Sequence, residues 1–393
     1  MLVKEKIAQA RSVLRELDVD CWITFVRETD ILADPMLVFL GPPELTWHSA
    51  FVVPHDGATR AIVGAQDVPT VSDLGAWDDV TGFTTGIREP LLACLRELDP
   101  RHVALNYSEG SEVCDGLTHG MFLTIQRLLG ELGMADRIVS AEPIISALRE
   151  RKTDWEVDAI RRAIRHTEEI FALTTGFIRP GRTEKEIATF MKAEATRRGI
   201  GLSWHESICP GVFTGPATAG AHYAPTDRAV ERGHVLNVDF GVKVDGYVSD
   251  LQRTFYVLAN GETAAPPDVV YGFDTIVAAI RECKDVMRPG TRGIEVDAVA
   301  RRVLRERGYA EFPHGLGHQV GRFAHDGTAL LGPAWEKYAG KPFRPLEAGM
   351  VFTIEPRLTV PGRGVCTVEE MVLVTAHGCE WLSAPQESLL LVS

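Results

Sequence analysis

Two stretches of the sequence, 109 residues apart, share one pattern, and this internal repeat constrains the fold more than any other feature. The first opens with "IRPGRTEKEIATFMKAEATRRG" at Ile178, and the second with "MRPGTRGIEVDAVARRVLRERG" at Met287. Each copy reads as a turn, an amphipathic helix, a strand and then a hairpin. His205 and His314 occupy the same place within the two copies. The repeat predicts two similar halves that face each other about a pseudo-two-fold axis, with a site between them.

The residues before the repeat alternate helix-like and strand-like patterns. Helical periodicity runs from Val3 to Leu17, and again through "IREPLLACLREL" and "GMFLTIQRLLGEL"; strand patterns occur at "CWITFV", "SAFVVP", "RAIVG" and "HVALNY". Near Glu150 one long amphipathic helix begins, and the charged run "RERKTD" before it is expected to be an exposed connection. A chain of 393 residues is long enough for two domains. We therefore predict an α+β protein, with an α/β domain over residues 1–149 and a second domain over 150–393.

The first hairpin of the repeat, "VLNVDFGVKVDGYVSDLQRTF", carries two acids among apolar residues. Asp245 and Gly246 are expected to form a two-residue turn, which makes Asp239 face Gln252. Asp239 and Asp250 are then diagonal neighbours on one face of the sheet. A buried, unpaired carboxylate is costly, so it must neutralise, pair with a cation or bind a metal. The alternative is that one or both acids face solvent on an edge strand.

The second hairpin, "GMVFTIEPRLTVPGRGVCTVEEMVLVT", carries Glu355 before a Pro-Gly turn and Glu369 after it. Its loop length is ambiguous by one residue, so a shared face for these two glutamates is plausible but not forced. Glu370 is the other candidate, and its side chain is expected on the opposite face.

Between the two hairpins, "HGLGHQVGRFAHDG" contains His314, His318 and His325. Its glycines would let the backbone approach neighbouring segments closely. Imidazole together with four carboxylates suits two divalent ions such as manganese, cobalt or zinc.

With "DFG…DGYVSDLQRTF", "HGLGHQVG…HD", "FTIEP" and "VEEMVLVT" in this order, the chain resembles the pita-bread metallopeptidases, in particular the prolidase and Xaa-Pro aminopeptidase branch. The resemblance covers essentially the whole length. It implies a pseudo-two-fold pita-bread catalytic domain over 150–393, preceded by a creatinase/prolidase-like domain.

The resemblance also implies a ligand set. Asp239 would chelate one ion, Asp250 and Glu369 would bridge both, and His318 and Glu355 would complete the second. A bridging hydroxide would attack the carbonyl before proline, and Glu355 would pass its proton towards the leaving nitrogen.

Three further histidines match the resemblance. His222 and His325 would stabilise the oxyanion, and His314 would be a third pocket histidine. The pattern departs from the family at Thr367, where family members usually have an arginine. The sequence offers three arginines that could instead bind the substrate carboxylate: Arg322, Arg357 and Arg363.

The predicted function is a proline dipeptidase with two divalent ions, manganese expected first. Alternatives are an Xaa-Pro aminopeptidase acting on longer peptides, a metal-free creatinase-type hydrolase, and a non-catalytic peptide-binding module.

A net charge of −13 argues against a nucleic-acid partner, and no apolar run is long enough for a membrane helix. Seven scattered cysteines without a CxxC favour a reducing, cytoplasmic location. The resemblance implies a homodimer.

Overall fold

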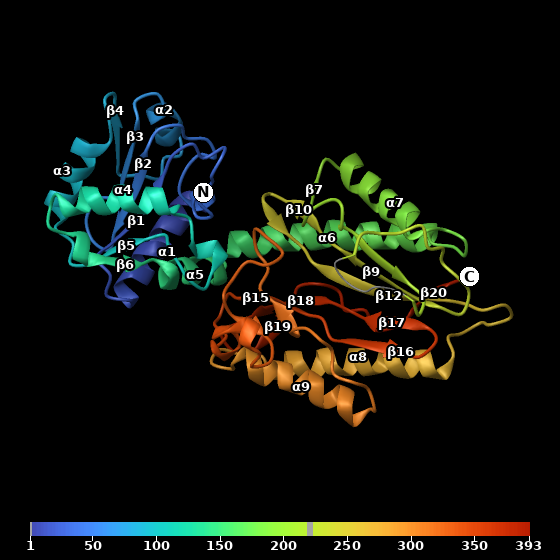
Figure 1. The fold of residues 1–393 in the computed structure, drawn as a ribbon. Helices are drawn as coiled ribbons and strands as arrows, with labels where there is room; N and C mark the ends of the chain where they lie inside the picture. Colours follow the sequence, from blue (N-terminus) through green and yellow to red (C-terminus); the bar gives the residue numbers. More distant parts are fainter. Residues whose placement is uncertain (1, 218–222) are drawn as a thin grey trace. The chain divides into compact units, whose positions relative to one another are not determined.

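The structure is a computed structural model that describes residues 2–217 and 223–393. The chain divides into two compact units, Met1–Arg149 and Glu150–Ser393, and both mix helices with sheets (Figure 1). The predicted α+β class is therefore confirmed. None of the helices in the described part of the chain combines the length and the apolar character needed to span a bilayer.

The N-terminal unit is built on a six-stranded mixed sheet with the strand order β4-β3-β2-β1-β5-β6. Strand β1 is buried on both faces and pairs antiparallel with β2 and parallel with β5, which accounts for its uninterrupted apolar sequence. Every helix and strand that the sequence predicts in this unit is present. The elements are α1 (Leu2–Glu16), β1 (Cys21–Val26), β2 (Ser49–Pro54), β3 (Arg60–Gly64), α2 (Val68–Ser72), β4 (Asp79–Phe83), α3 (Arg88–Leu98), β5 (Val103–Leu105), α4 (His119–Gly130), β6 (Ile138–Ser140) and α5 (Glu142–Glu150).

The charged run before the long helix is not an exposed connection, so that prediction was wrong. Arg149, Glu150 and Lys152 are all buried. Within the C-terminal unit, the Glu150 carboxylate accepts hydrogen bonds from the backbone N–H groups of Thr328 (2.6 Å) and Ala329 (3.1 Å). A charged group can be buried at acceptable cost when it is hydrogen-bonded, and sequence composition does not reveal such partners.

The C-terminal unit contains the internal repeat. Helices α7 and α9 each have 14 residues, and their bounds lie 109 residues apart, as do the RPG triplets before them. Glu186 and Glu295 each accept the backbone N–H of the residue preceding their helix, at 2.8 Å in both copies. The elements are α6 (Asp154–Phe177), α7 (Glu184–Arg197), β7 (Gly201–Leu202), β8 (Gly211–Thr214), β9 (Val235–Phe240), β10 (Val242–Val244), β11 (Tyr247–Val248), β12 (Leu251–Val257), α8 (Pro267–Val286), α9 (Gly293–Glu306), β13 (Gly317–His318), β14 (Leu330–Leu331), β15 (Val351–Ile354), β16 (Arg357–Val360), β17 (Gly364–Thr367), β18 (Glu370–Val374), β19 (Cys379–Trp381) and β20 (Leu390–Val392).

The two helix pairs of this unit, α6 with α7 and α8 with α9, lie on opposite sides of its strands (Figure 1). The strands of the two halves meet where Gln252 and Glu369 exchange backbone hydrogen bonds of 3.4 and 3.2 Å. The side chain of Asn237 strengthens this junction by donating to the Thr367 carbonyl oxygen at 2.6 Å. The acids of both hairpins are consequently brought to one place.

Candidate metal centre

The first hairpin has the register that its sequence predicts. Asp239 pairs with Gln252, and the turn residues Asp245 and Gly246 both have positive φ, 52° and 79°. Strand β9 lies between β8 and β12, and Asp250 is only 6% exposed. The alternative of solvent-facing acids on an edge strand is therefore wrong.

The second hairpin also brings its two acids together. Strand β15 pairs with β18 and β16 with β17 in one continuous register, so Glu355 lies opposite Glu369. Glu370 lies on the other face, as its sequence position predicts. Its buried carboxylate forms an ion pair with Arg253 at 3.1 Å and accepts a hydrogen bond from the Ser383 hydroxyl at 2.6 Å. Only the first of the two adjacent glutamates is thus available to the site.

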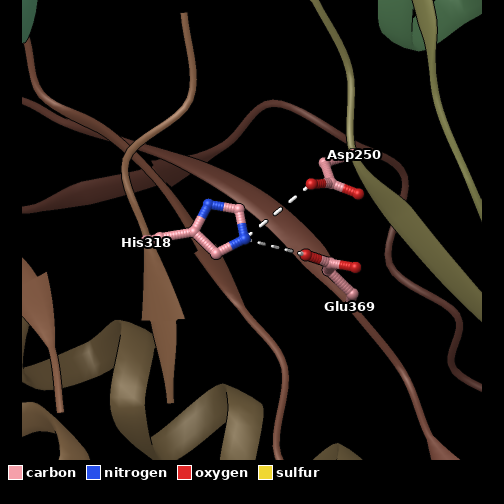
Figure 2. A group of neighbouring side chains, drawn as sticks. All are labelled: Asp250, His318 and Glu369. Atoms are coloured by element: carbon pink, nitrogen blue, oxygen red, sulfur yellow. Dashed lines mark ion pairs between the residues drawn. The ribbon is translucent and has the colours of Figure 1, made fainter. Parts of the chain in front are cut away.

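His318 joins the acids of the two hairpins. Its Nε2 atom lies 3.8 Å from Asp250 Oδ2, 3.5 Å from Glu355 Oε1 and 3.9 Å from Glu369 Oε1. Figure 2 shows the imidazole of His318 directed between the carboxylates of Asp250 and Glu369, which come from different elements. One ligand atom from each of these three residues can be chosen so that all lie within 4.8 Å of one another. This is the separation expected of groups that share a cation.

The electrostatics of the cluster favour a cation. Burial raises the pKa of Asp239 to about 7. Burial, followed by repulsion from neighbouring carboxylates, raises the pKa values of Asp250, Glu355 and Glu369 well above their ordinary range. Asp239 Oδ1 is buried and has no hydrogen-bond partner among the residues that the structure describes. A cluster of four carboxylates and one imidazole, in which one carboxylate oxygen lacks a hydrogen-bond partner, provides suitable ligands for divalent metal ions.

Gln252 is a member of the cluster that sequence reasoning missed. Its side-chain Nε2 donates to Glu369 Oε2 at 3.0 Å and lies 3.3 Å from Glu355 Oε2. The other oxygen of each glutamate is the one that faces His318. The amide therefore orients both carboxylates. Its register opposite Asp239 could be read from the sequence, but its reach across to the second hairpin could not.

An ion pair on α9 positions the segment that carries His318. Arg301 is paired with Asp297 at 2.6 Å and donates to the His314 carbonyl oxygen at 2.7 Å. The four-residue spacing of the pair on a helix was the available sequence signal. The glycine expected to allow close approach does so at Gly317, where a Cβ atom would overlap the Thr353 carbonyl oxygen.

The three additional histidines have different surroundings. The His325 ring packs edge-on against His318, with centroids 4.2 Å apart, so it lies beside the cluster. His314 Nδ1 is 2.8 Å from the carbonyl oxygen of the next residue, and its ring lies 5.1 Å from that of Phe312. His222 lies outside the described residues.

The three candidate arginines differ in their side-chain contacts and burial. Arg363 is bonded to Asp268 at 3.3 Å and donates to a backbone carbonyl oxygen. Arg322 lies over the Tyr247 ring, 5.2 Å from its centroid. Arg357, the first residue of β16, is half-buried, and this burial lowers the pKa of its guanidinium.

Comparison with known proteins gives consistent matches. The profile of metallopeptidase family M24 matches residues 158–376. The probable dipeptidase PepE of Mycobacterium tuberculosis is 31% identical over 297 residues, which cover 75% of this chain and 74% of that protein.

Two crystal structures resemble the whole chain. Dipeptidase PepE from Mycobacterium ulcerans has a TM-score of 0.75 and 26% identity, over 100% of this chain and 98% of that one. The X-Pro aminopeptidase from Thermotoga maritima has a TM-score of 0.75 and 25% identity, over 97% of this chain and 100% of that one. The named activities of these relatives are those of peptidases.

Proposed function

Because the chain belongs to metallopeptidase family M24, we propose that it is a metal-dependent Xaa-Pro dipeptidase. It would hydrolyse the bond that precedes proline in dipeptides. One relative is named a probable dipeptidase, which suggests the length of the substrate. One structural relative is named an X-Pro aminopeptidase, which suggests cleavage before proline. The observation that carries it is the convergence of Asp250, Glu355 and Glu369 on His318.

The proposed cofactor is a pair of divalent ions. Asp239 would hold one ion, Asp250 and Glu369 would be shared by both ions, and His318 and Glu355 would complete the second. The orphaned Oδ1 atom of Asp239 and the raised pKa values of the acids support this assignment. When bound, the ions would supply Lewis-acid polarisation of the peptide carbonyl and a water of lowered pKa. Manganese is expected first because the ligands are mostly carboxylate oxygens, with cobalt and zinc as alternatives.

The side chains around the metal ligands complete the proposed mechanism. Glu355 would accept a proton from the attacking water and deliver it to the leaving proline nitrogen. His325, beside His318, donates a hydrogen bond to the developing oxyanion. His222 is assigned the same role and His314 a place in the substrate pocket, both on the resemblance alone.

The second candidate is an Xaa-Pro aminopeptidase that acts on longer peptides, favoured by the whole-chain likeness to the Thermotoga maritima enzyme. A metal-free creatinase-type hydrolase and a non-catalytic binding module are disfavoured because all five candidate ligands are present and four of them converge. A homodimer and a cytoplasmic location remain predictions.

Metal analysis and a substrate panel test the proposal together. The purified protein is expected to bind about two manganese ions per chain and to cleave Ala-Pro faster than Ala-Pro-Ala. Preference for the tripeptide would make the protein an aminopeptidase. Failure to bind metal would overturn both the dipeptidase and the aminopeptidase proposals.

Adjacent glutamates provide a matched control for the ligand assignment. Glu369→Gln should lose metal, whereas Glu370→Gln, which alters a carboxylate already paired with Arg253, should retain it. Equal metal content in the two folded variants would contradict the assignment.

A further inference from the structure

Arg357 stands at a distinctive position in the second hairpin. It begins β16 two residues after Glu355, and its cross-strand partner is Thr367, two residues before Glu369. Cross-strand partners have Cβ atoms about 5 Å apart. Arg357 and Thr367 therefore form the next pair along the ladder from the two glutamates of the cluster.

The pattern of burial shows on which face the Arg357 side chain lies. Leu358 and Val360 belong to the hydrophobic core, whereas Arg357 is half-buried and Thr359 is exposed. Residues two apart on a strand share a face, so Arg357 shares its face with Glu355. The guanidinium thus extends from the face that carries the candidate metal ligands.

The side chain of Arg357 lacks a partner, whereas the two buried arginines of this unit and Arg363 each have one. Arg253 is paired with Glu370, Arg301 with Asp297, and Arg363 with Asp268. The side chain of Arg357 forms no hydrogen bond or ion pair with any of the residues in the ranges 2–217 and 223–393. A half-buried cation without a counter-ion is unfavourable, which indicates that an anion from outside the chain completes the site.

The carboxylates of the cluster are not that anion. Glu355 and Glu369 lie near His318 and share the Gln252 amide, and neither lies within ion-pair distance of Arg357. In the proposed function, two divalent ions balance the four acids, so a substrate carboxylate would bring negative charge that still needs a cation. The guanidinium forms bidentate pairs with planar carboxylates, which makes it well suited to this task.

We propose that Arg357 binds the free carboxylate of the substrate and thereby selects dipeptides. The inference rests on the proposed peptidase function and adds the residue that sets substrate length. Glu355 and Arg357 are about 7 Å apart along the strand. In an Xaa-Pro dipeptide the carboxylate is on the residue immediately after the scissile bond, and an arginine side chain can bridge that interval.

The test compares a dipeptide with its amide, Ala-Pro with Ala-Pro-NH2, in the manganese-loaded protein. Arg357→Ala should lower kcat/KM for Ala-Pro roughly 10–100-fold, mainly through KM, because a charge-assisted pair is lost. Turnover of Ala-Pro-NH2 should change little. Arg357→Lys, which keeps the charge but not the bidentate geometry, should give an intermediate loss. Arg302→Ala removes an arginine held by Glu282 and Glu306 on an exposed helix face and should leave the acid-to-amide ratio unchanged.

A binding measurement separates this inference from the proposed function. Calorimetry should show that L-proline binds the wild type more tightly than Arg357→Ala, and that L-prolinamide does not distinguish the two proteins. If the loaded wild type cleaves neither peptide, the proposed function fails, and the proline comparison still tests the carboxylate site. Equal losses for acid and amide, or equal proline affinity in folded wild type and variant, would overturn the role of Arg357.

Discussion

Replacing Asp239 by asparagine should stabilise the metal-free protein and at the same time weaken its response to metal. Asp239 lies on β9 between two paired strands, and burial raises its pKa to about 7. Its Oδ1 atom lacks a hydrogen-bond partner among the described residues. The ionised carboxylate is therefore a cost to the folded state that only a cation offsets, and a neutral amide of the same shape removes it.

The magnitude follows from the difference in pKa between the folded and unfolded states. A rise from 3.8 to about 7 corresponds to about 4 kcal/mol of lost stability, at 1.36 kcal/mol per pKa unit. Because the folded-state pKa is the higher one, the loss is absent below the unfolded pKa, grows as pH rises, and is complete above about 7. Asp239→Asn should therefore gain about 4 kcal/mol at pH 8 but only about 2 kcal/mol at pH 5.5.

Urea unfolding in the presence of a chelator measures this difference at both pH values. The control is Asp297→Asn, which alters a buried acid that Arg301 already pairs at 2.6 Å. That variant should lose about 3 kcal/mol because it leaves a buried guanidinium uncompensated. Added manganese should stabilise the wild type much more than Asp239→Asn. If Asp239→Asn unfolds more easily than the wild type at pH 8 without metal, the reasoning is refuted.

Three other substitutions test separate parts of the site. Asp250→Asn should lose both ions, because the proposed function has the two ions share this carboxylate; full metal content by elemental analysis would show that Asp250 does not bridge. His325→Ala should retain metal and fold but lower kcat about 10²–10³-fold, as expected for the loss of one oxyanion donor; an unchanged kcat would make the residue structural, and metal loss would make it a ligand. Gln252→Leu should weaken metal binding about 10–100-fold, because the amide that orients Glu355 and Glu369 is lost; calorimetric titration with manganese that gives the wild-type affinity would exclude this positioning role.

The local sequence determined the elements of the fold and much of the candidate ligand set. Helix period, the capping glutamates and the RPG turns are local signals, which is why α7 and α9 lie where the repeat predicts. The register of the first hairpin follows from its two turn residues alone, since Asp245 and Gly246 accept positive φ. Together with the order of motifs, these signals were sufficient to predict the pseudo-two-fold unit and to select its acids.

The burial, orientation and pairing of the charged side chains depend on contacts between distant segments. Composition made the segment at Glu150 look exposed, but its partners come from residues about 180 positions later. Gln252 orients Glu369 from 117 residues away. The sequence does not distinguish the three candidate arginines, whereas the structure shows that Arg363 is already paired with Asp268. The physical reason is that burial and hydrogen bonding set the cost of a charge, and both depend on which remote segments pack around it. The sequence names the charged groups, whereas the tertiary structure determines which of them remain without a partner.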